Sequence, residues 1–299
     1  MTDSPGTDAP PDPATAREAL LAAADPLDRT DRVPVTVSVG RTLAADATAR
    51  KSVTGALDAG EAVYSAGHRI RPGDVGVLAA AGIEKVAVVQ RPEVGVVPLG
   101  EPGTTTAATA LGLAQYVDRW SGKVTLRDAV PASRPALRPA VQRDLTRDGL
   151  AFVGTEPGDA LRDVVGDLGA VRCSRVAIEP GGDAGIAVVR ERPVLLSPPS
   201  PVGARVAAVQ LLRPLVRAFA GDPPAEHPTR TVSLTAHLET DPERTSFVPV
   251  ELEDGSATPL SGRDRVVAAR ADGWVTVPAG ESERERGASV AVADWDYLP

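Results

Sequence analysis

The sequence predicts an α/β domain with a mostly parallel sheet and helices on both faces, together with an N-terminal linker segment and a small C-terminal β-barrel. Apolar strand-like segments alternate with helical ones over roughly 130 residues from Pro92 onward, which is typical of a parallel sheet covered by helices. Gly221-Asp222 and two prolines then interrupt the chain, and beyond them apolar residues recur with a period of two. This change of period marks the start of an all-β domain.

Composition divides the chain into four parts. Residues 1–13 contain mainly Pro, Asp and Gly, with almost nothing apolar, and predict a disordered tail. Residues 14–91 predict an N-terminal linker domain, residues 92–222 the α/β domain, and residues 229–299 the β-barrel domain.

The linker domain shows only short elements. Residues 14–25 have helical spacing, and strict alternation of valines over residues 33–39 predicts a half-buried strand. Residues 72–81 predict a turn, an N-cap and a short helix, and residues 86–89 a strand. His68 lies in a glycine-rich turn, so we expect a solvated side chain rather than a ligand.

The α/β domain opens with a strand that begins at Val94, a glycine loop over 99–103 and a helix that Thr104 can cap. This unit suits an anionic ligand, because it places unpaired backbone N–H groups at a helix N-terminus. An ordinary βα unit with an empty turn explains the same pattern. The remaining segments predict strands at 123–126, 150–153, 171–178, 186–189 and 194–196, and helices at 136–147 (closed by Gly149), 159–168 (closed by Gly169) and from Pro201 onward, kinked at Pro214.

The last 70 or so residues predict a small β-barrel or sandwich, because several short alternating segments are joined by turns. Alternation covers residues 232–238 and 248–252, and Asp254-Gly255 is a tight-turn pair. Residues 274–277 and 289–292 predict further strands.

Charge and cysteine content exclude several classes of protein. The chain has 32 Lys and Arg against 40 Asp and Glu, a net charge of −8, so a basic nucleic-acid surface is not expected. Cys173 is the single cysteine, which rules out an internal disulfide and favours a reducing compartment. No long apolar run and no signal-peptide pattern occur, so we expect a cytoplasmic protein with no membrane contact. Few lysines and no asparagine favour a halophilic cytosol, although GC-rich coding produces the same arginine bias.

The usual catalytic motifs are absent from the sequence. There is no GxxxxGK loop, no GxGxxG after a strand, no CxxC or HExxH pair and no GxSxG elbow. The remaining candidates are acids in loops that follow strands, which a parallel sheet brings to one crevice. They are Glu101, Glu156, Asp159, Glu179 and Asp183.

Five segments in this order resemble the MoeA family, the molybdopterin molybdenumtransferases, which includes the E-domain of gephyrin. They are VPVTVSVGRTLAADATA, SAGHRIRPGDVGVLAAAGIEKVAVVQRPEVGVVPLGEPG, VRCSRVAIEPGG, SPPSPVGARVAAVQLLRPLVRAFAG, and the terminal RADGWVTVPAG with RGASVAV. The resemblance runs from about Ala16 to Val292, with one large gap. It implies a molybdopterin-binding-like α/β domain and a homodimer.

The loops that carry the family's site differ here. Residues 99–102 read Leu-Gly-Glu-Pro where the family has Thr-Gly-Asp-Glu, and residues 154–159 lack the family's double glycine. Residues 196–201 read Leu-Ser-Pro-Pro-Ser-Pro in place of Leu-Pro-Gly-Asn-Pro, which reduces the number of N–H donors. Residues 49–61 replace the inserted domain of the family.

The resemblance implies two catalytic acids, Glu101 and Asp159, which are also the expected ligands of Mg²⁺. It implies ligand-binding roles for Gly100, Gly103, Thr104, Thr155, Gly158, Ser197 and Ser200. Two hypotheses follow. A divergent paralogue would bind molybdopterin, adenylylated molybdopterin or a pathway partner with reduced or no catalysis, and would need no cofactor. An active transferase would insert molybdate into adenylylated molybdopterin with Mg²⁺. The sequence favours the paralogue, because all three loops have changed.

Overall fold

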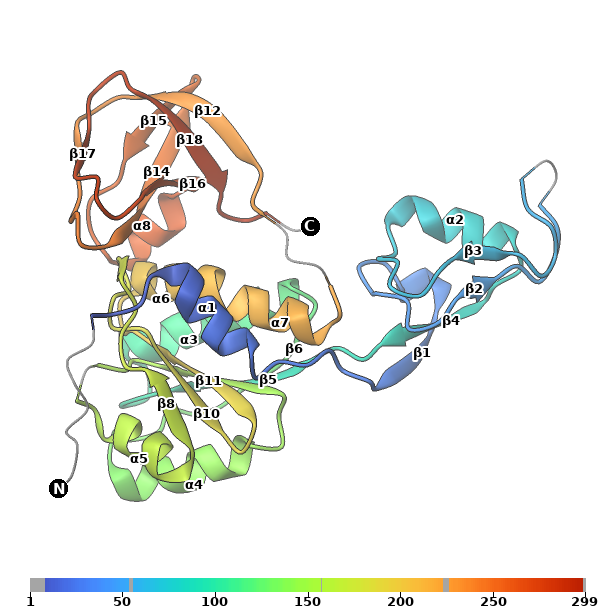
Figure 1. Cartoon of the computed structure of the whole chain (residues 1–299), viewed down its shortest axis with the longest axis horizontal. Helices are drawn as coiled ribbons and strands as arrows, with labels where there is room; N and C mark the ends of the chain where they lie inside the picture. Colours follow the sequence, from blue (N-terminus) through green and yellow to red (C-terminus); the bar gives the residue numbers. More distant parts are fainter. Residues whose placement is uncertain (1–8, 54–55, 157, 223–225, 298–299) are drawn as a thin grey trace.

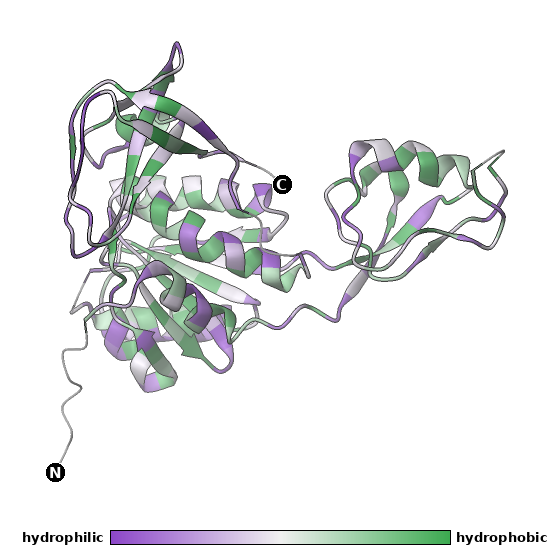
Figure 2. Ribbon diagram, turned by 45° about the horizontal axis from the view of Figure 1, so that its top comes forward, coloured by the Kyte–Doolittle hydropathy of each residue, from purple (hydrophilic) through white to green (hydrophobic). Residues whose placement is uncertain are grey.

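A computed structural model describes residues 9–53, 56–156, 158–222 and 226–297. It shows three parts: an α/β body, a β-barrel beside it, and a small lobe on the opposite side (Figure 1). Most of the predicted tail, residues 1–8, lies outside the described residues. Apolar residues gather where the helices of the body face its sheet (Figure 2).

Helix α1 (Pro13–Leu21) begins within the segment expected to be a tail. The Asp12 carboxylate accepts the N–H of Ala14 at 2.8 Å and so caps the helix. The carbonyl of Pro11 accepts the N–H of Ala177 at 2.8 Å. Ala16 and Leu20 of α1 are fully buried in the same cluster as the main sheet. The helix therefore packs on the α/β body, although the sequence grouped it with residues 14–91.

The lobe is built on an antiparallel pair, β1 (Thr30–Pro34) and β4 (Lys85–Val89). The predicted strand over 33–39 is wrong beyond Pro34, because Pro34 already pairs with Lys85, the first residue of β4. The chain turns instead into a short 3₁₀ helix, η1 (Val35–Val37), and Val37 is 64% exposed. The lobe also contains β2 (Ala47–Thr48), β3 (Ala62–Tyr64) and α2 (Pro72–Ala80).

A buried carboxylate joins the lobe to the body. Thr42 and Arg69 of the lobe both donate to the carboxylate of Asp222, which follows α7 (Arg213–Phe219). Arg217 of α7 lies 3.5 Å from the same carboxylate. The side chain of Asp222 is 1% exposed, whereas that of Arg69 is 26% exposed.

The sheet of the body has six strands in the order β6-β5-β7-β11-β10-β8. Their bounds are β5 (Glu93–Pro98), β6 (Lys123–Leu126), β7 (Gly149–Val153), β8 (Ala170–Cys173), β10 (Gly185–Val189) and β11 (Arg192–Ser197). Strands β6, β5, β7 and β11 pair in parallel, whereas β10 is antiparallel to both of its neighbours. The sheet is therefore mixed. Arg190 and Glu191 form the β10–β11 turn, both with positive φ.

Two helical layers cover this sheet. Apolar residues of α4 (Arg134–Asp144) and α5 (Ala160–Leu168) share one buried cluster with Phe152 and Leu196. A second buried cluster lies on the other face of the sheet, where strand residues such as Ala151 and Leu195 point away from the first cluster. The helices that contribute to it are α1, α3 (Thr105–Arg119), α6 (Pro201–Ala207) and α7. Gly149 begins β7 and does not close α4, contrary to the prediction.

A π-helical segment, η2 (Ala208–Leu212), lies between α6 and α7. Pro214 explains it, because proline has no N–H to offer the carbonyl of Gln210, four residues earlier. Arg17 of α1 donates Nε to that carbonyl at 3.1 Å. The predicted kink at Pro214 is thus a change of helix type that another helix stabilises.

The predicted strand over 171–178 is two strands. β8 ends at Cys173, and β9 (Ile178–Glu179) pairs with the barrel strand β14 (Thr245–Glu253). The barrel is closed by the pairing of β15 (Ser256–Pro259) with both β14 and β12 (Thr229–Leu234). The other elements of this domain are β13 (Leu238–Glu239), α8 (Arg265–Arg270), β16 (Gly273–Val277), β17 (Glu283–Arg284) and β18 (Ser289–Asp294). None of the described helices has the length and apolar character needed to cross a bilayer.

Candidate functional site

The carboxyl ends of the three central strands lie side by side. The N–H of Leu99 donates to the carbonyl of Val153 at 2.8 Å, and the N–H of Gly154 donates to the carbonyl of Ser197 at 2.9 Å. These bonds join the ends of β5, β7 and β11. The loops over 99–103, 154–159 and 197–201 therefore meet at one edge, which is on the left in Figure 1. We call this edge the strand-end site.

The first loop leads into α3. Gly100 and Gly103 both have positive φ, and the N–H of Gly100 donates to the carbonyl of Val130 at 2.9 Å. Thr104 is the N-cap of α3, and its hydroxyl donates to the carbonyl of Glu101 at 2.9 Å. The Glu101 side chain is exposed. This loop is therefore a tight turn, held by internal hydrogen bonds, that leads into the N-terminus of α3.

The second loop uses its polar groups in hydrogen bonds within the protein, both to Ser197 and between its own residues. The N–H and the hydroxyl of Thr155 both donate to the carbonyl of Ser197, at 2.9 and 3.0 Å. Asp159 is the N-cap of α5, and its carboxylate accepts the N–H of Glu156 at 2.5 Å. Gly158 has positive φ and is exposed. The expected site residues are present, but Thr155 faces the interior.

The third loop leads into α6. Ser200 is the N-cap of this helix, and its hydroxyl accepts the N–H of Gly203 at 3.1 Å. Ser197 is fully buried, and its hydroxyl has no hydrogen-bond partner among the described residues. A buried hydroxyl without a partner is unusual in proteins. The hydroxyl of Ser197 therefore lies inside the protein and is not exposed at the surface of the strand-end site.

Arg162 is a site residue that the sequence did not reveal. It lies in α5, is 9% exposed, and donates to the carbonyls of Glu156, Ser174 and Asp183. Burial lowers the pKa of its guanidinium from the ordinary value. A signal was available, because Arg162 stands between the buried residues Leu161 and Val164 of the helix.

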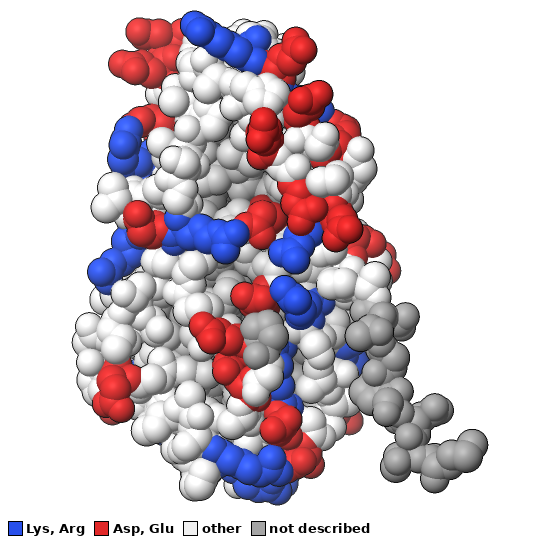
Figure 3. Space-filling model, turned by 90° about the vertical axis from the view of Figure 1, so that its left-hand side faces the viewer, with Lys and Arg blue, Asp and Glu red and all other residues white. Residues whose placement is uncertain are grey.

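Acidic and basic side chains are interspersed over this side of the molecule (Figure 3). Glu179 accepts hydrogen bonds from Arg244, at 3.4 Å, and from Arg263. These bonds connect the segment that follows β8 to the C-terminal domain. Arg175 and Asp183 form a further ion pair at 3.2 Å. These arginines already face carboxylates, which lowers their attraction for an anionic ligand.

The described residues do not bring together a metal site of their own. No group of three or more His, Cys, Asp or Glu side chains among them is placed to hold a metal ion. Glu101 and Asp159 stand on different loops, and Asp159 already accepts the N–H of Glu156.

His68 is not solvated as predicted. Its ring stacks on Tyr64 with centroids 4.2 Å apart, and its Nε2 lies 2.7 Å from the Asp74 carboxylate. Tyr64 and the backbone of Arg71 donate to the same carboxylate. This cluster holds the lobe together and lies on the side of the chain away from the strand-end site.

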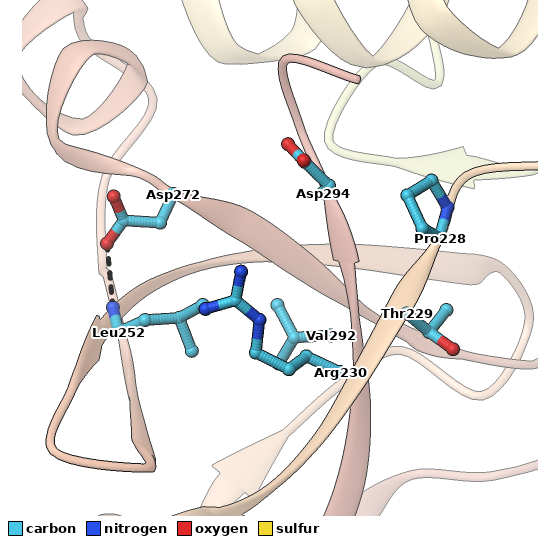
Figure 4. Close-up of a pocket in the computed structure, with 7 residues that line it drawn as sticks. All are labelled: Pro228, Thr229, Arg230, Leu252, Asp272, Val292 and Asp294. Carbon is cyan, nitrogen blue, oxygen red and sulfur yellow. Dashed lines mark hydrogen bonds between the residues drawn. The ribbon is translucent and has the colours of Figure 1, made fainter. Parts of the chain in front are cut away.

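The barrel wall contains a cavity of about 350 Å³ (Figure 4). Its described lining includes Arg230, Asp272 and Asp294. The Asp272 carboxylate accepts the N–H of Leu252 at 2.8 Å, so it holds the backbone of β14. No site residue predicted from the sequence is among those that line it.

Comparison with known proteins agrees with this architecture. The barrel matches the family described as MoeA C-terminal region (domain IV) over residues 231–295. Molybdopterin molybdenumtransferase 2 of Mycobacterium tuberculosis is 27% identical over 95% of this chain and 78% of its own length. The chain is a MoeA-like protein.

This MoeA-like chain is also 28% identical to Molybdopterin molybdenumtransferase 1 of Mycobacterium tuberculosis, over 78% of the chain. It spans 62% of the length of that relative. The solved molybdenum cofactor biosynthesis protein from Pyrococcus furiosus shares its fold, with a TM-score of 0.78 and 21% identity over 95% of this chain and 99% of that one. A molybdopterin biosynthesis MoeA protein from Pyrococcus horikosii gives a TM-score of 0.78 at 17% identity, over 96% and 99% of the two chains.

Proposed function

We propose that the chain acts in molybdenum cofactor biosynthesis as a divergent paralogue. It would bind a molybdopterin species, or a protein of the pathway, at the strand-end site with reduced or no catalysis. Similarity to two mycobacterial molybdopterin molybdenumtransferases supports the pathway. Fold alone does not supply a function, so the proposal depends on the loops.

The observation that carries this proposal is the use of N–H donors inside the protein. Gly154 and Thr155 donate to the carbonyl of Ser197, and Glu156 donates to the carboxylate of Asp159. A phosphate or molybdate is held by several converging N–H groups. The three prolines at 198, 199 and 201 have no N–H to add. The strand-end site therefore offers an anion few backbone donors.

An active transferase is the second candidate, inserting molybdate into adenylylated molybdopterin. Ser197 favours it, because a buried hydroxyl at this edge has no partner among the described residues. Glu101 and Asp159 would supply the acids. Mg²⁺ fits this pair only if substrate phosphates complete its ligand set, as Mg²⁺ often requires.

Titration of the purified chain with adenylylated molybdopterin, followed by molybdate and magnesium, separates the two candidates. Binding without molybdenum insertion above the uncatalysed rate supports the paralogue. Insertion above that rate overturns it and supports the transferase. If neither occurs, capture of a pathway protein by the immobilised chain is the remaining support, and its failure overturns the proposal.

Two matched substitutions in α5 test the role of the loop. Asp159→Ala removes the acceptor of the Glu156 N–H, so binding or turnover at this edge should fall. Asp163→Ala changes an exposed acid one turn later and should leave both unchanged. Equal behaviour of the two variants would remove Asp159 from the site.

We also propose a cytoplasmic homodimer adapted to a salt-rich cytosol. An acidic chain with a net charge of −8 is stabilised when salt screens its self-repulsion. Sedimentation equilibrium in low and molar KCl measures the oligomeric state, and thermal unfolding at the same two salt concentrations measures the stability. A monomer at both salt concentrations contradicts the dimer, and unchanged thermal stability contradicts the salt adaptation.

A further inference from the structure

A second cavity lies between the body and the barrel. It has a volume of about 520 Å³ and is lined by α1, the segment from η2 to α7, and the barrel strands β14 and β16. It shares no described lining residue with the strand-end site. A cavity of this size is within the range that holds small organic ligands.

Three arginines line one wall of this cavity. Arg17 comes from α1, and Arg213 and Arg217 come from α7. Arg213 and Arg217 are 3% and 5% exposed. Three acids also line the cavity: Asp222 is buried, whereas Glu18 and Glu226 are exposed. The interior wall is therefore more positive than the rim.

The three arginines repel one another. Burial, and then the charges of Arg217 and Arg17, together lower the pKa of Arg213 to about 10. Asp222 lies 3.5 Å from Arg217, but it also accepts from Thr42 and Arg69 of the lobe. Like charges in a poorly hydrated site attract an anion more strongly than the same charges in water.

His227 stays neutral beside this cluster. Arginine only donates, so the Nε2 of His227 must accept from Arg213 at 2.9 Å. The Nδ1 then carries the proton and donates to the carbonyl of Asp294 at 2.8 Å. The histidine thereby orients Arg213 without adding charge.

The part of the cavity that the barrel supplies is aromatic. Phe247 and Trp274 of the barrel line the cavity, each is 5% exposed, and their ring centroids are 6.4 Å apart. A flat ring packs well against such side chains. We propose that this cavity binds a small organic anion with an aromatic ring, the ring against Phe247 and Trp274 and a carboxylate or phosphate group toward Arg17 and Arg213.

The test uses 8-anilinonaphthalene-1-sulfonate, a fluorescent aromatic anion, with the full chain. We expect saturable binding of one molecule, with energy transfer from tryptophan. N-phenyl-1-naphthylamine has the same rings without the sulfonate and should bind at least about tenfold more weakly, because it lacks the charge interaction. Equal binding of the two probes overturns the proposal.

Arg213→Gln should weaken binding of the sulfonate by at least about tenfold. Arg17→Gln, at the less buried arginine, gives a second variant if Arg213→Gln does not fold. Arg134→Gln, on the exposed surface of α4, is the matched control and should bind like wild type. Unchanged affinity in the folded cavity variants overturns the proposal.

Discussion

Arg162 Nη2 donates to the carbonyl of Asp183 at 2.7 Å and links α5 to the loop before β10. Its Nε donates to the carbonyl of Glu156 at 3.1 Å, and its Nη1 donates to Ser174. One buried guanidinium thus joins the loop over 154–159 to the segments that contain Ser174 and Asp183. The position of this loop of the strand-end site therefore depends in part on Arg162.

Replacement of Arg162 by Met should destabilise the protein by about 3 kcal/mol, because three carbonyls lose a charged donor. Hydrogen exchange should speed up in the loop over 154–159. Arg172→Met, at an exposed position of β8, is the control and should change stability by less than about 0.5 kcal/mol. Urea denaturation measures both. A variant as stable as the control would contradict this role of Arg162.

The meeting of the loops over 99–103, 154–159 and 197–201 could be predicted from the sequence. The three hydrogen bonds that Arg162 donates could not. Each loop follows an apolar strand and precedes a helix, and parallel strands bring such loops to one edge. The target carbonyls of Arg162 belong to Glu156, Ser174 and Asp183. A backbone carbonyl leaves no trace in residue type, so the sequence does not reveal such bonds.

Local pattern also failed where pairing partners decide the structure. The valines over 33–39 alternate perfectly, yet β1 ends at Pro34, which pairs with the first residue of β4. The sequence predicts one strand over 171–178, but β8 joins the main sheet and β9 joins the barrel. Periodicity describes the exposure of a residue, while the partner strand comes from distant parts of the chain.

Gly169 closes α5, as the sequence predicts. It does so in an extended conformation, with a φ of −166°. A Cβ at this position would lie 2.1 Å from the carbonyl oxygen of Val188. Gly169→Ala should therefore destabilise the protein by about 2–3 kcal/mol through a backbone clash.

Gly166, inside the same helix, is the matched control. It is exposed, and a Cβ there would meet only Val171 at 3.9 Å. Gly166→Ala should stabilise the protein by about 0.5–1 kcal/mol, because alanine favours the helix. Thermal unfolding of the two variants should give opposite shifts. Unchanged or increased stability of Gly169→Ala would show that the close approach of Gly169 to β10 is unimportant.

Asp74 holds the lobe through its ionised carboxylate. Burial alone would raise its pKa, but hydrogen bonds from the Arg71 backbone, then from His68, Arg71 and Tyr64, place the pKa well below the ordinary 3.8. The stabilisation is therefore present above about pH 4 and is lost only as the pH falls further. Asp74→Asn removes it at neutral pH and should cost about 3 kcal/mol.

Hydrogen exchange of β4 measures the stability of the lobe in this variant. Asp58→Asn, at an exposed acid of the same lobe, is the control and should exchange like wild type. If Asp74→Asn also exchanged like wild type, the hydrogen bonds to Asp74 would contribute nothing.

His227 predicts a dependence of stability on mildly acidic pH. Burial, and then the charge of Arg213, lower the pKa of its ring from 6.5 to about 4 in the folded protein. Between these values the unfolded chain binds a proton that the folded chain does not. The free energy of unfolding should therefore rise with pH from about 4 to 6.5 and level off above.

His227→Gln should be less stable than wild type at pH 7.5, with a gap in the free energy of unfolding that narrows toward pH 4.5. Denaturant titrations across this range measure the gap. Thr276→Ser, in the same cavity wall, should keep the wild-type profile, and a constant gap for His227→Gln would contradict the lowered pKa.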